Sequence, residues 1–163
     1  MTLVQKDIIR RVDDLTALEL LIPRAHEGRK EHYQLAFAFS VPDWQGLFVQ
    51  FWQLECKAFA ELEQKLSEVG GVMGQEFKIS ETSFPSSQGD SILKDKTLLL
   101  SCINQKYQIL PAYEAVRRRP MSFDVKKMVQ RHHMQGLYIL EQLERIFPVL
   151  AAPVDLPTIP LPG

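Results

Sequence analysis

The sequence predicts an all-α protein built as a four-helix bundle. Four long segments carry apolar residues at intervals of three and four, the spacing that lines one face of a helix. None of them shows the sustained alternation of a half-buried strand. At 163 residues the chain is long enough for one buried core and short for two. We therefore expect a single helical-bundle domain over residues 1–147, followed by an extended, proline-rich tail over residues 148–163.

The first segment begins with a short amphipathic stretch over residues 2–14, whose apolar face carries Val4, Ile8 and Val12. Thr16 and Glu19 then have the spacing of a capping box, which marks a helix start. Pro23 should kink the helix or begin it anew. The apolar stripe nevertheless runs on without a change of phase, so one long helix is also compatible with it. We expect a break between Asp13 and Pro23 that separates a short extra N-terminal helix from the main one.

The second segment, residues 42–69, is the longest amphipathic pattern of the chain. Ser40 or Asp43 can cap its start. Gly70 and Gly71 follow its last periodic residue and suit a left-handed C-cap. Its stripe consists of Trp44, Phe48, Phe51, Glu55, Ala58, Leu62, Leu66 and Val69.

Residues 70–90 have no clear period, and they could either cross the length of the bundle or form a mobile loop. A third helix is expected over residues 91–118, bent by an internal proline and stopped by Pro120. Ser122 can cap a fourth helix, which we expect over residues 123–147.

Composition narrows the classes of function. The net charge of −1 gives no overall field that would attract nucleic acid or an anionic membrane. No apolar run is long enough to span a bilayer, and the charged N-terminal stretch is not a signal peptide. Cys56 and Cys102 lie in helical segments without the spacing of a metal site or a disulfide framework. We expect a protein of the reducing cytoplasm, without a nucleic-acid or membrane partner.

Several short motifs follow one another between Leu18 and Ile146. In chain order they are Leu18-x-x-Leu21-Ile22, Glu27-Gly28, Leu47-Phe48, Glu61-Leu62 ahead of Gly70-Gly71, Asp95-x-x-Leu98-Leu99-x-x-Cys102, and Tyr113 before Ala115-Val116. In their order and spacing, the chain resembles the uncharacterised ferritin-like four-helix-bundle proteins of bacteria, a family of unknown function. The resemblance implies a ferritin-like bundle, often dimeric, with no established activity.

The chain departs from that family in its third helix and before it. The family tends to place acidic residues after the cysteine of the third helix, whereas this chain has Ile103, Lys106 and Tyr107 at the matching places. The chain also lacks the additional helical, tryptophan-containing sequence that the family carries between its second and third helices.

A ferritin-type di-iron centre takes carboxylates from four helices and a Glu-x-x-His pair from two of them. Here Glu55 is followed three residues later by Ala58, so the second helix has no such pair. The middle of the third helix has no acidic residue, and the fourth offers Gln130 three residues before His133. This ligand count argues against a di-iron oxidase or ferroxidase, and we assign no catalytic or cofactor-binding residue.

A smaller polar set remains, because His32, Glu55 and His132 lie on the apolar stripes of three different helices. Two imidazoles and one carboxylate could hold one zinc, manganese or iron ion. Alternatively, the histidines are core residues hydrogen-bonded to Glu55 or to nearby tyrosine and glutamine side chains, with no metal. Since helix neighbours point about 100° apart, only one of His132 and His133 should face the core.

Three functions stay open. The favoured one is a non-catalytic structural or protein-interaction role, as a homodimer or with another protein, because Trp52 lies beside the stripe where a partner could cover it. The second is a metal-binding protein or mononuclear metalloenzyme that uses the two histidines and the glutamate. The third is a small-molecule binding bundle, in which Gly28 and Gly136 leave gaps next to the histidines.

Overall fold

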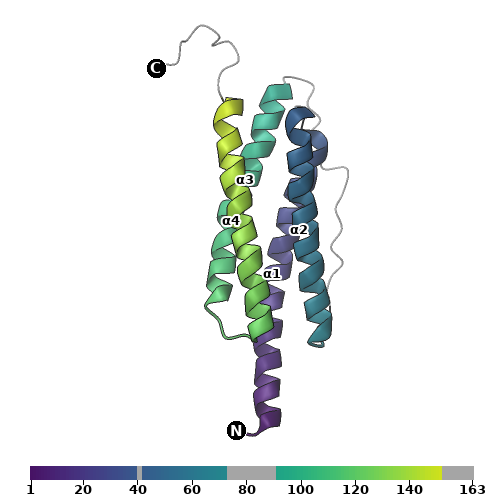
Figure 1. Cartoon of the computed structure of the whole chain (residues 1–163), viewed down its shortest axis with the longest axis vertical. Coiled ribbons are helices and arrows are strands. Elements are labelled where there is room, and N and C mark those ends of the chain that lie inside the picture. Colours follow the sequence, from purple (N-terminus) through teal and green to yellow (C-terminus); the bar gives the residue numbers. More distant parts are fainter. Residues whose placement is uncertain (40–41, 73–90, 152–163) are drawn as a thin grey trace.

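The computed structural model describes residues 1–39, 42–72 and 91–151, and the structural statements below concern these residues. They form four α-helices and no strand: α1 (Leu3–Ala38), α2 (Pro42–Glu68), α3 (Ser91–Arg117) and α4 (Phe123–Ala151) (Figure 1). The predicted all-α four-helix bundle is therefore confirmed.

The order of the helices in the bundle follows from their contacts. α1 packs along both α2 and α3, and α4 packs mainly on α3 and only thinly on α2. The beginnings of α2 and α3 lie at one end, since Phe48 and Leu99 share a cluster with Phe39. At the other end, Lys65 of α2 pairs with Asp124 of α4. α2 and α3 thus run in the same direction, as in ferritin-type bundles that contain one long connection. Most of residues 70–90, for which the sequence left a crossing connection and a mobile loop open, lie outside the described residues.

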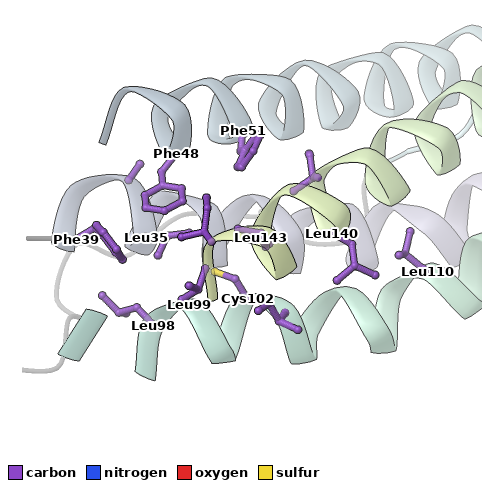
Figure 2. Close-up of a cluster of buried hydrophobic side chains, with 14 residues drawn as sticks. Leu35, Phe39, Phe48, Phe51, Leu98, Leu99, Cys102, Leu110, Leu140 and Leu143 are labelled. Carbon is purple, nitrogen blue, oxygen red and sulfur yellow. The ribbon is translucent and has the colours of Figure 1, made fainter. Parts of the chain in front are cut away.

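Two apolar clusters fill the bundle, one toward each end. The first lies where α2 and α3 begin and includes Phe39, Phe48, Phe51, Leu99 and Leu143 (Figure 2). The second includes Ala17, Leu18, Leu62, Tyr113 and Val125. Burying each such aliphatic or aromatic side chain contributes about 1.5–3 kcal/mol, so these clusters supply the main stabilisation of the fold.

α1 is one continuous helix, so the expected break between Asp13 and Pro23 and the separate short N-terminal helix are wrong. The capping box is made at Thr2, whose hydroxyl accepts from the Gln5 amide while the Gln5 side chain accepts from the Thr2 amide. The hydroxyl of Thr16 instead donates to the Val12 carbonyl at 2.8 Å, a bond made inside the helix. Pro23 removes one N–H donor, and the carbonyl that loses its partner belongs to Glu19, an exposed residue that water can reach.

The C-terminus of α2 confirms the predicted glycine cap. Gly70 has a φ of 84°, in the left-handed region that glycine enters without a steric cost. Its N–H bonds to Ser67 at 3.1 Å, and the N–H of Gly71 bonds to Leu66 at 2.8 Å, the paired bonds of a Schellman motif. The predicted N-terminal caps, Ser40 and the side chain of Asp43, lie outside what is described.

α4 continues through Pro148 to Ala151, so the proline-rich tail does not begin at residue 148 as expected. Proline lacks only its own N–H donor, so one helical hydrogen bond is lost. The carbonyl that would have accepted it belongs to Glu144, an exposed residue that water can reach. The rest of the predicted tail, residues 152–163, lies outside the described residues. No helix in the described ranges is long and apolar enough to cross a membrane.

Candidate functional site

A layer of buried polar side chains separates the two apolar clusters. His32, Glu55, Lys106 and His132 are all buried, one from each helix. In α1, α2 and α4 the residues of the first cluster lie on one side of this layer and those of the second cluster on the other, whereas in α3 Leu110 of the first cluster lies beyond Lys106. We call these four residues the polar layer. It contains all three site residues predicted from the sequence, together with a lysine that was not predicted to belong to the site.

Lys106 and Glu55 form an ion pair across the bundle, from α3 to α2. Only 3% of the lysine side chain and 8% of the glutamate side chain are exposed. Two charges can remain buried in this way because each neutralises and hydrogen-bonds the other. A sequence signal for this pair does exist, since Leu99, Ile103, Lys106 and Leu110 share the apolar stripe of α3. A charged residue on such a stripe needs a buried partner.

The ion pair sets the charge state of Glu55. Burial is the largest single effect and raises the pKa of this carboxyl, but the charge and hydrogen bond of Lys106, together with His32 and His132, lower it by more, so the pKa lies below its ordinary value. Glu55 is therefore ionised at neutral pH. One of its oxygens also lies close to Gly28, where a β-carbon would stand 3.1 Å from Oε2.

His32 is neutral at pH 7. Burial and the nearby Lys106 ammonium lower its pKa to about 4, against the weaker opposing effect of Glu55. Its Nδ1 donates to the Gly28 carbonyl at 2.8 Å, which leaves Nε2 as an acceptor. Among the described residues, nothing donates to that buried nitrogen.

His132 connects the polar layer to the seam between α2 and α4. Its Nε2 lies 3.6 Å from a carboxylate oxygen of Glu61, which is held from the other side by Arg131 at 2.5 and 3.0 Å. That separation is too long for a hydrogen bond. Burial lowers the pKa of His132, so this ring is also neutral at pH 7. Neither of its nitrogens has a hydrogen-bond partner within the described ranges.

His133 is buried too, so the expectation that only one of the two neighbouring histidines faces inward is wrong. Its ring stacks on Tyr113 with a centroid distance of 6.5 Å, and Arg117 donates to its Nδ1 at 2.9 Å. The physical reason is that α4 has neighbours on two sides. Positions that point about 100° apart on this helix are therefore both covered.

The space beside the polar layer is small. A cavity of about 10 Å³ is lined by Glu55, Lys106, Tyr113 and His132, among others. That volume suits one water molecule. Gly28 and Gly136 do not leave the predicted gaps. The Glu55 carboxylate approaches Gly28, and Leu110 would stand 2.7 Å from a β-carbon at Gly136.

His32, Glu55 and His132 thus share one buried layer, but the carboxylate is already bound by an ammonium. Across the residues that the structure describes, no three histidine, cysteine, aspartate or glutamate side chains are grouped so as to hold a metal ion. The single-metal site remains a prediction. A metal there would have to replace Lys106 as the partner of Glu55.

Trp52, the residue expected to await a partner, already packs against its own chain. Its ring contacts Tyr33 and Phe37 of α1 edge to face, with centroid distances of 5.6 and 5.3 Å. Phe37 remains 54% exposed, so this aromatic group stays partly open to solvent.

The two thiols should differ in reactivity. Cys56 is half-buried and Cys102 is buried, with its thiol donating to the Glu31 carbonyl at 3.5 Å. Burial raises the pKa of both thiols, and that of Cys102 the more strongly. We expect iodoacetamide to label Cys56 slowly and Cys102 only after unfolding. Mass spectrometry of native and denatured samples measures this, and a bridge between the two sulfurs would contradict it.

Comparison with known proteins identifies the fold. No family model and no curated protein sequence matches the chain. A crystal structure of a two-domain protein from Anabaena variabilis, which contains DJ-1/ThiJ/PfpI-like and ferritin-like domains, matches with a TM-score of 0.69. The match covers 94% of this chain and 41% of that one, at 14% sequence identity. The chain has a ferritin-like fold. At this identity the likeness concerns the fold alone, and the chain spans less than half the length of that protein.

Proposed function

We propose that this protein is a non-catalytic ferritin-like bundle whose role is to associate with protein. The observation that carries the proposal is the ion pair between Lys106 and Glu55. The Lys106 ammonium group lies in the middle of the bundle and is ion-paired with Glu55, the one carboxylate of the polar layer. The core therefore balances its own charge and needs no bound cation.

Ferritin-type chemistry would require a different set of side chains at this level. Two metal ions need several carboxylates to offset their charge. The described part of the polar layer offers one carboxylate, two neutral imidazoles and a competing cation. The family that the chain resembles tends to have acidic residues in this part of the third helix, where Lys106 stands. In this chain Lys106 instead provides an internal counter-ion for Glu55.

The surface supplies what an interaction role requires. Large apolar side chains are exposed along the first turns of α1, where Val4, Ile8 and Val12 are each more than half exposed. Contiguous exposed apolar side chains of this kind mark sites of association. We place the protein in the cytoplasm of a bacterium, a reducing setting that suits the free thiols of Cys56 and Cys102.

Metal analysis of the protein, purified without a metal-affinity tag, tests the proposal. We expect well below one zinc, manganese or iron ion per chain, and a melting temperature that EDTA does not change. His26→Gln serves as the control, because His26 lies outside the polar layer. The proposal fails if the protein carries about one ion per chain that is lost in both His32→Gln and His132→Gln but kept in His26→Gln. That result would establish the metal-binding alternative.

The small-molecule alternative would need room that the described core does not offer, since the cavity at the polar layer holds about 10 Å³. Ligands of drug size occupy pockets of about 300–1,000 Å³.

A further inference from the structure

The first turns of α1 stand apart from the bundle. Residues 3–12, which we call the α1 arm, extend beyond the ends of the other helices at the N-terminal end of α1 (Figure 1). Every residue of the arm is exposed. Its ten residues measure about 15 Å along the helix axis. The arm has no packing partner of its own within the described bundle, so its apolar side chains are available to one.

The apolar face of the arm is continuous with the core. At 3.6 residues per turn, Val4, Ile8 and Val12 lie within roughly 40° of one direction. They are 68%, 57% and 54% exposed. The same line continues into Leu15, which packs against the second apolar cluster. A partner on this face would extend the buried core along the arm.

We propose that the occupant is the α1 arm of a second copy, paired antiparallel about a two-fold axis at Ile8. This inference rests on the proposed association role and names its partner. Because the apolar residues are spaced evenly about Ile8, the antiparallel arrangement sets Val4 of each copy opposite Val12 of the other. Ile8 meets Ile8 on the axis. An interface of this kind is self-complementary, as two-fold symmetry requires.

The charges of the arm select the antiparallel direction. Asp7 and Arg11 lie on the same flank of the stripe, about 100° and 60° from Ile8, whereas Gln5 and Ile9 occupy the other flank. Antiparallel two-fold pairing brings like flanks together. Asp7 of each copy then lies within about two residues, or 3 Å along the axis, of Arg11 of the other copy. Two ion pairs result, while parallel pairing would set both charges against Gln5 and Ile9.

The surface beside the apolar stripe is open to the second copy. Met1, Gln5, Ile8 and Ile9 line a shallow, open stretch of surface there. All four belong to the arm end of α1, so an antiparallel arm can lie against them without rearrangement of the bundle.

Sedimentation of the full chain across a concentration series tests the pairing. We expect a reversible equilibrium between the 18.7 kDa chain and a dimer. Ile8→Glu should raise the dimer Kd on the order of a hundredfold, because it sets two carboxylates face to face in an apolar contact. Leu3→Glu is the control, since Leu3 is 80% exposed and lies about 140° around the helix from Ile8, away from the apolar stripe. Both variants alter exposed positions, and circular dichroism checks that each is folded.

Charge exchange between copies tests the direction. Asp7→Arg and Arg11→Asp should each weaken self-association, and mixing the two variants should restore a heterodimer with both ion pairs. A chain that stays monomeric at every concentration overturns the inference. So does a dimer that survives Ile8→Glu, or a mixture that does not restore binding. None of these results depends on the metal content of the protein, which is the test of the proposed function. Failure of the pairing is therefore distinguishable from failure of the proposed function.

Discussion

Replacing Lys106 by methionine should lower the free energy of unfolding by about 3–5 kcal/mol, the usual cost of removing one partner of a buried ion pair. The methionine keeps most of the volume of the lysine side chain, so the loss reflects electrostatics more than a cavity. Glu55 would be left buried with a negative charge and no counter-ion. Urea denaturation at pH 7, followed by circular dichroism, measures the change.

Adding Glu55→Gln to Lys106→Met removes the stranded charge. The double variant should therefore recover to within about 1 kcal/mol of the wild type, because a neutral buried pair often replaces an ionic one at little cost. Lys126→Met is the matched control at an exposed position of α4 and should change stability by less than about 0.5 kcal/mol. If Lys106→Met behaved like this control, the buried ion pair would not exist in solution.

The fold was predictable because it depends on features that lie within single helices. The apolar stripes alone specify four helices, and the glycine pair after α2 specifies its cap. The ion pair was not predictable in the same way. The position of Lys106 on an apolar stripe shows that it is buried, but its partner depends on which helices face one another across the bundle. Which helices face one another depends on the direction of α3. The sequence did not predict that direction, because residues 70–90 could either cross the bundle or form a loop.

The errors along the helices came from local signals that a continuous helix can accommodate. Thr16 carries a capping signal, yet its hydroxyl is satisfied inside α1 by the Val12 carbonyl. Pro23 and Pro148 break helices in isolation, but each removes only one donor from its helix. At Pro23 the packing of Leu21, Ile22 and Ala25 in the core offsets that loss. His133 was misjudged for a similar reason, because coverage by two neighbouring helices cannot be deduced from one stripe.

Acid should destabilise the protein, and His32 should account for much of the effect. The pKa of His32 is about 4 in the folded chain and about 6.5 when unfolded, so between these values only the unfolded state binds its proton. Stability therefore rises with pH across this window and is lost as the pH falls from about 7 to 4. The difference corresponds to about 3 kcal/mol. His132 and His133, whose pKa values burial also lowers, act in the same direction.

His32→Gln isolates this contribution, since glutamine cannot take up a proton but can still donate to the Gly28 carbonyl. The variant should lose about half or more of the decline in unfolding free energy between pH 7 and pH 4.5, whatever its stability at pH 7. His26→Gln is the control, because His26 is only half-buried and its pKa shift is the smaller one. Glu55 titrates below this window and so contributes little to the comparison. Urea titrations at several pH values measure this decline. If the decline were the same in His32→Gln as in the wild type, His32 would already be protonated in the folded protein. The neutral state of His32 beside Lys106 would then be wrong.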